Sequence, residues 1–490
     1  MLLGIDIGTS SVKVSVVDVV TQRNIASAQY PQEEASIISL QKGWAEQSPE
    51  TWWQYVKQAI NKLNAEKKIN LKEIKAIGIA YQMHGLVLVD DQQNVLRNSI
   101  IWCDSRAVEI GDDAFKNIGE EKCLSCLLNS PGNFTASKLA WIKKNEPGIY
   151  EKIYKIMLPG DFIAMKLTGE ITTTVPALSE GIFWDFKKDE LSKDIFNYYG
   201  FDESIIPEIK NVFSFHGQLK NEVAEALQLT PGIAVTYKAG DQPNNALSLN
   251  VLQPGEVAAT AGTSGVIYGV ADKLVCDKRS RVNTFAHINY SDEEKRLGVL
   301  LCINGTGILN RWIKNNFNVQ QYGDMNDEVT KISAGSNGLK ILPFGNGAER
   351  MLNNKTIGAH ISNINFNVHS KAHIYRAAQE GIAFAFRYGL DIMRENKMNP
   401  KVIRAGKANM FLSPVFTKAF VNATQVQVEL FENDGSAGAA LGAGIGAQIY
   451  KTYNEAFSNF KPLYKVEPTD IDQYNELYFE WKQLLEKHLN

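Results

Sequence analysis

The pattern of hydrophobic and polar residues at the start of the chain predicts a β-hairpin. Residues 2–7 form a largely apolar run, and residues 8–11 (Gly-Thr-Ser-Ser) have the composition of a tight turn. From Val12 to Val16, valine alternates with polar residues, which is the period of a strand with two different faces. We therefore expect two strands joined by a short polar turn.

The following segments predict helices and strands in alternation. Ser48-Pro49-Glu50 offers an N-cap, a proline for the first turn and an acid at the positive end of a helix. Residues 53–63 then carry an apolar stripe at helical spacing, as do residues 374–392 and 471–485. Strands are expected from the apolar runs at 74–80, 86–89 and 233–240. This mixture predicts an α/β fold.

The hairpin pattern occurs a second time in the other half of the chain. Residues 8–18 (GTSSVKVSVVD) and 262–272 (GTSGVIYGVAD) are identical at six of eleven positions without gaps. Both segments follow an apolar or small-residue strand. A chance likeness between two hairpins is the alternative, but two copies favour a duplicated architecture.

We place the boundary between the halves in the connector of residues 245–255, which gives domains of residues 1–247 and 248–490. Residues 435–443 are rich in glycine and alanine. They could form a phosphate-binding loop, but the start of a helix packed closely against a neighbour is the favoured interpretation.

Composition narrows the class of protein. The 490 residues suffice for at least two domains, and 44% hydrophobic and 21% charged residues are typical of a globular protein. The net charge is −3 and both signs are mixed along the chain, so nothing favours nucleic acid or an anionic membrane as a partner. The five cysteines are sparse, and neither a signal-peptide core nor a membrane span is evident. We expect a cytoplasmic protein.

The two Gly-Thr-Ser turns are candidate phosphate-binding sites. Glycine allows the backbone to approach an anion, while hydroxyl and exposed N–H groups donate to phosphate oxygens. One turn in each half suggests that a single phosphate chain is held from both sides. The chain has no Walker A motif, so it is not a P-loop enzyme.

Two acids follow strand-like runs close to such turns. Asp6 ends the first run, and Asp241 follows residues 233–240. An acid in this position suits a Mg²⁺ site, usually through water. Asp241 could instead accept the proton of an attacking hydroxyl. A simple turn cap is the structural alternative for each acid.

His84 and the cysteine pair offer weaker signals. His84 lies in Tyr81-Gln82-Met83-His84-Gly85, and no nearby ligand residues favour a metal. A neutral imidazole that hydrogen-bonds a sugar hydroxyl fits this position, although a structural histidine is common. Cys123 and Cys126 form a lone C-x-x-C without a second ligand pair, so a structural role is favoured over zinc.

Taken together, these segments resemble the FGGY carbohydrate kinases over nearly the whole chain. Residues 6–11 are similar to the first phosphate motif of that family and residues 262–265 to the second. Residues 43–47 and 342–350 are similar to two further segments of the family. Within the family, Met83-His84-Gly85 resembles the sugar-contacting Met-His-Gly of the xylulose-phosphorylating branch.

The resemblance implies a fold and an activity. The expected fold is a duplicated actin-like one, with a ribonuclease H-like core in each half and the active site in a central cleft. The implied reaction transfers phosphate from ATP, with Mg²⁺, to the 5-hydroxyl of a ketopentose, D-xylulose being favoured. Family members commonly form homodimers.

The resemblance and the motifs together define the expected site. Gly240-Asp241-Gln242 matches the catalytic Gly-Asp-Asn/Gln of the family, which makes Asp241 the base, and Asp6 and Asp241 the acids near the metal. Residues 102–106 resemble the Trp-x-Asp-x-Arg stretch of the family. The sugar is expected at Met83, His84, Gly85, Trp102, Asp104 and Gln242. ATP is expected at Gly8, Thr9, Ser10, Ser11, Lys13, Gly262, Thr263, Ser264, Ala405, Gly406, Lys407 and Asn409.

One segment departs from the family pattern. The adenosine loop usually reads Gly-Gly-Gly-Ala, whereas residues 404–409 read Arg-Ala-Gly-Lys-Ala-Asn. A lysine at residue 407 would be strained if that position needs a positive φ. We expect a reshaped loop in which Lys407 or Asn409 contacts the nucleotide.

Two rival functions follow from the same residues. The first is another sugar kinase of this family, acting on ribulose, fuculose, rhamnulose or gluconate. The second is a non-catalytic actin-like protein that binds nucleotide as a chaperone or filament subunit. Such a protein needs neither the Met-His-Gly segment nor the Gly-Asp-Gln segment.

Overall fold

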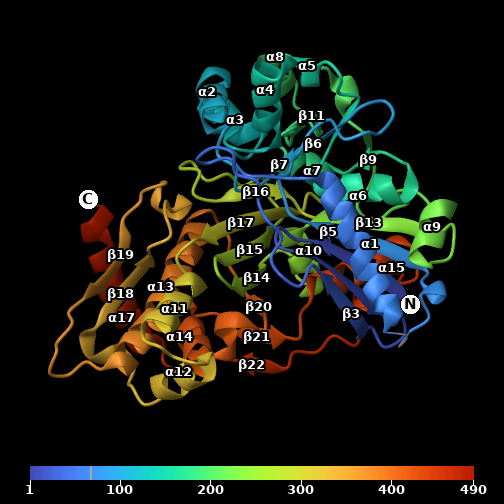
Figure 1. The fold of residues 1–490 in the computed structure, drawn as a ribbon. Helices are drawn as coiled ribbons and strands as arrows, with labels where there is room; N and C mark the ends of the chain where they lie inside the picture. Colours follow the sequence, from blue (N-terminus) through green and yellow to red (C-terminus); the bar gives the residue numbers. More distant parts are fainter. Residues whose placement is uncertain (67–68, 490) are drawn as a thin grey trace.

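The computed structural model describes residues 1–66 and 69–489, which form two α/β halves, each built on a mixed sheet (Figure 1). The first sheet has the order β13-β5-β1-β2-β3. Its strands are β1 (Leu2–Ile7), β2 (Val12–Val17), β3 (Asn24–Tyr30), β5 (Ala76–Tyr81) and β13 (Ala234–Gly240).

The second sheet repeats this order and extends it. It runs β16-β17-β15-β14-β20-β21-β22. Its strands are β14 (Glu256–Ala261), β15 (Gly265–Ala271), β16 (Asn283–Ala286), β17 (Leu297–Ile303), β20 (Val402–Gly406), β21 (Val428–Phe431) and β22 (Tyr464–Val466). In each half the first strand (β1 or β14) pairs antiparallel with the next strand and parallel with a later one (β5 or β20). The duplicated hairpin predicted from the repeat is confirmed, because each Gly-Thr-Ser turn joins the first two strands of its sheet.

Helices and short strands complete the two halves. The helices of the N-terminal half are α1 (Pro49–Ala65), α2 (Val108–Ile118), α3 (Glu120–Cys126), α4 (Thr135–Asn145), α5 (Pro147–Tyr150), α6 (Pro159–Thr168), α7 (Val175–Glu180), α8 (Lys193–Tyr199), α9 (Asn221–Leu227) and α10 (Asp241–Ser248). Those of the C-terminal half are α11 (Gly307–Asn316), α12 (Tyr322–Val329), α13 (Lys371–Glu395), α14 (Pro414–Thr424), α15 (Gly435–Gly446), α16 (Tyr453–Ala456) and α17 (Ile471–Leu489). Short strands are β4 (Glu46–Gln47), β6 (Val87–Val89), β7 (Ser99–Ile100), β8 (Lys155–Met157), β9 (Thr172–Thr173), β10 (Trp184–Asp185), β11 (Glu190–Leu191), β12 (Glu208–Ile209), β18 (Lys340–Phe344) and β19 (Gly358–Ser362).

The helix that begins at Ser48 forms as its sequence predicts. The Ser48 side chain accepts a hydrogen bond from the backbone N–H of Thr51, and Pro49 occupies the first turn. The apolar stripe of α1 is buried against the first sheet. Local capping and hydrophobic periodicity therefore suffice to define this element.

The small-residue segment is a helix packed against a sheet, as favoured above. Helix α15 belongs to the C-terminal half but lies on β1 and β5 of the first sheet, as Figure 1 shows by its orange-red colour beside blue strands. A side chain at Gly4 would come within 1.7 Å of the Ser436 carbonyl oxygen, and one at Gly78 within 2.0 Å of that of Ala439. Only glycine at these positions permits such a close approach.

Helix α10 ends at Ser248 and β14 begins at Glu256, so the expected connector lies between two elements. The domain boundary itself stays a prediction. Helix α10 of the N-terminal half and helix α15 of the C-terminal half pack against each other and join the halves.

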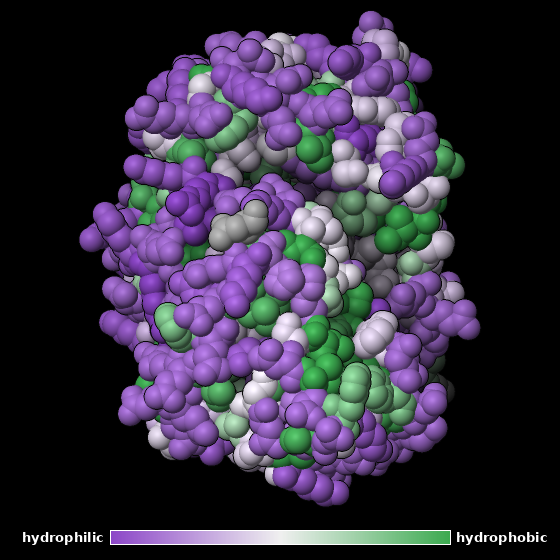
Figure 2. Space-filling view, turned by 90° about the vertical axis from the view of Figure 1, so that its left-hand side faces the viewer, coloured by the Kyte–Doolittle hydropathy of each residue, from purple (hydrophilic) through white to green (hydrophobic). Residues whose placement is uncertain are grey.

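The surface is mainly polar. Figure 2 shows a largely hydrophilic face in which hydrophobic side chains form smaller patches. Phe366, just after β19, is 91% exposed. The expected homodimer stays a prediction.

Candidate active site

Three parallel strands bring the predicted catalytic segments to one edge of the first sheet. In the register of β1, β5 and β13, Ile7 lies beside Tyr81 and Tyr81 beside Gly240. Asp6 is therefore near the end of β1, residues 83–85 follow β5, and Asp241 follows β13. The carboxyl ends of neighbouring parallel strands form the usual binding edge of α/β sheets.

Asp6 and Asp241 form an electrostatically strained pair. Burial, and then the charge of Asp6, raises the pKa of Asp241 to about 7. Burial, and then the charge of Asp434, raises the pKa of Asp6 to about 6, although Lys13 opposes this. Lys13 itself forms an ion pair with Asp434. Neither acid forms an ion pair with a residue of the described ranges, so the two fit the neighbourhood of a divalent metal.

The first Gly-Thr-Ser turn directs its carbonyl groups into the protein. The Thr9 carbonyl accepts from the Gln47 side chain (2.8 Å), that of Ser10 from the Ala35 N–H (2.7 Å), and that of Ser11 from the Gly8 N–H (3.0 Å). No residue of the described ranges accepts from the backbone N–H groups of Thr9, Ser10 or Ser11. These donors are left for an external acceptor, as in an anion-binding turn.

The second turn has the same property. Thr306, at the start of α11, donates its hydroxyl to the carbonyl groups of Gly262 and Thr263, at 3.1 Å each. The N–H groups of Gly307 and Ile308 donate to the same two carbonyls. Within the part of the chain that the structure describes, the N–H groups of Thr263 and Ser264 have no acceptor.

Polar contacts tie both hairpins to the segment that precedes and opens α15. The ion pair between Lys13 and Asp434 joins β2 to this segment. A side chain at Gly435 would come within 2.4 Å of a carboxylate oxygen of Asp6. Asn245 accepts from Asn433 (2.9 Å) and donates to Thr260 on β14 (3.3 Å). The two hairpins therefore border one common region.

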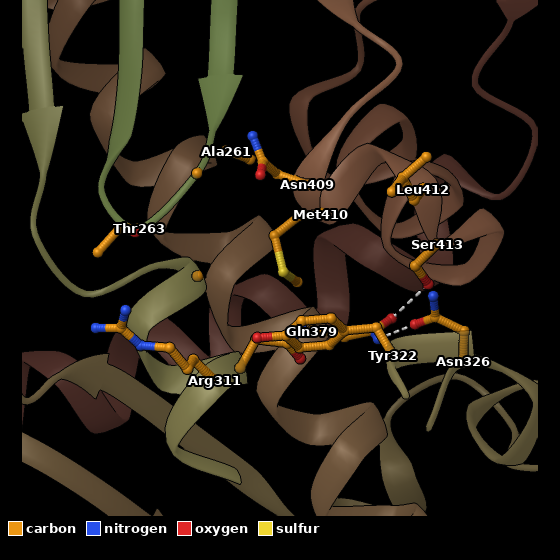
Figure 3. A pocket seen from close by; sticks show the side chains of 13 residues that line it. Ala261, Thr263, Arg311, Tyr322, Asn326, Gln379, Asn409, Met410, Leu412 and Ser413 are labelled. Carbon is orange, nitrogen blue, oxygen red and sulfur yellow. Dashed lines mark hydrogen bonds between the residues drawn. The ribbon is translucent and has the colours of Figure 1, made fainter. Parts of the chain in front are cut away.

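A cavity of about 220 Å³ opens beside the second turn (Figure 3). Figure 3 shows Asn409 and Met410 facing it from the segment after β20, and Arg311 from α11. The Gln379 side chain on α13 accepts a hydrogen bond from Ser413 (2.8 Å) and donates one to Asn326 (3.0 Å). These two bonds hold three lining residues of the cavity in place. Its position beside a phosphate turn and its size suit a nucleoside.

The backbone of residues 404–409 has no positive φ at Lys407, so the strain considered for that residue does not arise. Ala405 and Gly406 belong to β20 and do not line the cavity. The exposed Lys407 places its ammonium group 4.1 Å from the centre of the Tyr464 ring, so the expected contact of Lys407 with the nucleotide finds no support in this geometry. Asn409 carries the positive φ, 54°, and lines the cavity. Asparagine tolerates this conformation better than most side chains.

His84 is held as a neutral hydrogen-bond acceptor. Its Nδ1–H donates to the carbonyl of Glu180 (3.1 Å), which leaves Nε2 as an acceptor. Burial, and then the charge of Lys138, lowers the pKa of His84 to about 3. The ring contacts Phe134 and Phe285, at centroid distances of 4.9 and 5.5 Å. His84 has a φ of 63°, a strained conformation typical of functional residues.

The residues around His84 complete one wall. Met83 is buried, and a side chain at Gly240 would meet it at 2.7 Å. A side chain at Gly85 would meet Pro159 at 2.8 Å, so the backbone here is closely packed. Gln242 is half-buried beside Asp241 at the start of α10.

Trp102 and Asp104 have different environments. The half-exposed Trp102 donates its indole N–H to the Thr9 hydroxyl (2.9 Å), which joins this loop to the first turn. Asp104 is fully buried and binds the Arg106 side chain through both oxygens, with the shortest contact 2.7 Å. It also accepts from the Ala45 N–H (2.5 Å). Asp104 therefore positions the loop, and the expected direct contact with a sugar finds no support.

Sequence reasoning missed several residues of this region. Glu180 is buried beside Gly240, and one of its oxygens has no hydrogen-bond partner. Burial, and then the charge of Asp241, raises the pKa of Glu180 well above its usual range. Phe285, Cys302 and Arg350 come from the C-terminal half. Only Arg350 had a signal, because it ends the motif at residues 342–350.

The described residues exclude two classes of site. They contain no group of three or more histidine, cysteine or acidic residues that could enclose a metal ion. The acids Asp6 and Asp241 could therefore hold Mg²⁺ only with water and phosphate oxygens completing its shell. Across the same residues, no helix has the length and apolar character needed to cross a membrane.

Comparisons with known proteins agree with this geometry. Models described as the N-terminal and C-terminal domains of the FGGY family of carbohydrate kinases match residues 1–248 and 257–449. The chain is 28% identical to a xylulose kinase of Lactococcus lactis subsp. lactis, over 99% of this chain and 96% of the relative. It is 26% identical to a xylulose kinase of Staphylococcus xylosus, over 99% of each.

A solved structure supports the fold. The glycerol kinase of Plasmodium falciparum with ADP superposes with a TM-score of 0.89 at 22% identity, covering 100% of this chain and 98% of that one. The expected duplicated actin-like α/β fold is thereby confirmed.

Proposed function

This chain belongs to the FGGY family of carbohydrate kinases, and on that premise we propose that it phosphorylates D-xylulose to D-xylulose 5-phosphate. That it is a sugar-phosphorylating enzyme follows from the family. The choice of sugar rests on the Met83-His84-Gly85 segment and on the xylulose kinases among its relatives.

One observation carries the mechanism: Asp241 follows β13 at the edge where β1 and β5 also end, and burial and the charge of Asp6 raise its pKa to about 7. A base with a pKa near the working pH accepts a proton efficiently. Asp241 takes the proton of the 5-hydroxyl while that oxygen bonds to the γ-phosphorus and the bond to ADP breaks. His84 Nε2 accepts a hydrogen bond from another sugar hydroxyl and so orients the ring or chain of the sugar.

The nucleotide occupies the cavity beside Asn409, and its phosphates receive the unpartnered N–H groups of the two Gly-Thr-Ser turns. Mg²⁺, held near Asp6 and Asp241 through water, would neutralise charge on the phosphates. Closure of the halves over the sugar excludes water as a competing acceptor.

The experiment is an ADP-release assay with a panel of sugars. D-xylulose should give the highest kcat/KM among xylulose, ribulose, fuculose, rhamnulose, gluconate and glycerol. Because the glycerol kinase has the same fold, the fold alone does not determine which sugar is phosphorylated, and the panel is needed to identify it. A clear preference for another sugar would refute the D-xylulose assignment. ATP hydrolysis without any phosphorylated sugar would refute the kinase chemistry itself.

A second experiment tests the base. Asp241→Asn should lower kcat by about 10²–10⁴-fold, the usual contribution of a general base, while ATP still binds. Near-normal turnover in this variant would remove Asp241 from the base role.

A further inference from the structure

Arg350 is a cation without a counter-charge at the border of the active site. It is half-buried at the start of the short helix Arg350–Leu352, in the C-terminal half. Within residues 1–66 and 69–489, no group forms a hydrogen bond or ion pair with its side chain. Charged groups withdrawn from water normally have a partner, so an unpaired guanidinium calls for a ligand.

The backbone that carries Arg350 is rigidly fixed to the second phosphate turn. The preceding Glu349 is fully buried and accepts from the N–H groups of Asn304 and Gly305, at 3.0 Å each. The next residue, Thr306, is the one that binds the carbonyl groups of the turn. A continuous series of hydrogen bonds therefore sets Arg350 relative to Gly262 and Thr263.

Arg350 is also within electrostatic range of His84, a residue of the N-terminal half that contacts the sugar in the proposed function. Its charge adds to the effects of burial and of Lys138 that lower the pKa of His84. Burial and the charge of Asp241 raise the pKa of the Cys302 thiol, whereas the charge of Arg350 lowers it. Cys302 is the second-last residue of β17, and Ile303, the last, directly precedes the Asn304–Thr306 segment. Arg350 is thus tied through Glu349 to the segment that holds the phosphate turn, and its charge reaches His84 in the N-terminal half.

We propose that Arg350 binds the phosphoryl group while it passes from ATP to the sugar, and then the phosphate of the product. Guanidinium presents several N–H donors in a planar fork that matches two phosphate oxygens. In the reaction the sugar oxygen bonds to the γ-phosphorus, the bond to the β-phosphate oxygen breaks, and the hydroxyl proton goes to Asp241. Charge on the three equatorial oxygens is where a fixed cation is most effective.

This inference rests on the proposed function for the presence of a sugar acceptor, but not on which sugar is used. Arg350→Gln and Arg350→Lys should be compared with Arg279→Gln, a matched control at an exposed arginine that is not part of the candidate site. Rates are measured with the best sugar of the wild type, varying sugar and ATP separately.

Arg350→Gln should lower kcat by about 10²-fold or more, as loss of a transition-state donor does, with the KM of the sugar nearly unchanged. The inhibition constant of the phosphorylated product should rise by at least about tenfold, since the product carries the phosphate that Arg350 holds. Arg350→Lys should recover part of the rate, and added methylguanidinium should raise the rate of Arg350→Gln. Arg279→Gln should match the wild type.

Two results would overturn the inference. One is a kcat for Arg350→Gln within about threefold of the wild type, below the effect of even one lost donor. The other is a lower melting temperature with no change in product inhibition and no recovery by lysine or methylguanidinium, which would define a structural residue. A wild type that phosphorylates no sugar would instead refute the proposed function, so the two failures are distinguishable.

Discussion

Replacing Asp241 with asparagine should stabilise the protein while it removes activity. When folding raises the pKa of an acid, the folded state binds the proton of that acid more tightly than the unfolded chain does. For Asp241 the ordinary value is 3.8 and the value in the structure is about 7. Between these pH values the folded state binds more protons, so stability falls as pH rises, and above pH 7 the full cost is present. Asparagine carries no charge and avoids this cost.

The magnitude follows from the same numbers. At 1.36 kcal/mol per pH unit, the difference between 3.8 and about 7 gives a ceiling of about 4 kcal/mol. Because Asp241 is half-buried and partly screened by water, we expect a gain of about 1–2 kcal/mol. Asp6 supplies a comparable amount: two strand spacings separate the acids by about 10 Å, which corresponds to about 1.7 kcal/mol at an effective dielectric constant of about 20.

Thermal unfolding without divalent cations measures the effect. Asp241→Asn should melt about 2–4 °C above the wild type at pH 8, and the difference should shrink towards pH 4. Asp161→Asn is the matched contrast, because Asp161 binds buried Lys238 at 2.6 Å. Its loss leaves a buried cation unpaired and should cost about 3–5 kcal/mol. An unchanged or lower melting temperature of Asp241→Asn at pH 8 would refute the reasoning.

Two further predictions test the packing and the charge state of the site. Gly435→Ala should lower kcat at least about tenfold, because its methyl group would enter the space of the Asp6 carboxylate. Gly323→Ala, where the added methyl group would meet no atom within 4 Å, should leave kcat unchanged. Equal kcat values for the two variants would contradict the close approach of Gly435 to Asp6. Glu180→Gln should keep kcat/KM within about threefold of the wild type from pH 6 to 8, because the amide resembles the protonated acid that burial and the charge of Asp241 favour. A loss of about tenfold would show that Glu180 is charged.

Much of the fold could be predicted because its signals are local. Period-two alternation defined the hairpin at residues 2–17, and the cap at Ser48 defined the start of α1. The repeat at residues 262–272 was visible because the same turn chemistry is used twice. The acids Asp6 and Asp241 could be selected because both follow strands, and parallel strands end at one edge.

The rest depends on contacts that no local pattern contains. Phe285 reaches His84 only because β16 of the other half lies against the N-terminal half. The pKa of Glu180 is raised by its burial and by the charge of Asp241, and neither cause can be read from its neighbours in sequence. The backbone of residues 404–409 could not be foreseen either, because the positive φ falls at Asn409, two residues after Lys407. Asp104 follows the expected motif, yet Arg106 satisfies both of its oxygens.

The distribution of unpaired charge explains why the site needs both halves. Burial and the charge of Asp6 raise the pKa of Asp241 at the edge of the first sheet, while Arg350, in the C-terminal half, has no hydrogen bond or ion pair with any described residue. Asp161 and Lys238, by contrast, form a buried ion pair in which each charge has a partner. Asp6, Asp241 and Arg350 are instead kept apart on elements fixed by separate hydrogen-bond systems. In the proposed function a metal-bound phosphate chain would satisfy both at once, because it would offer a cation to the acids and an anion to the arginine.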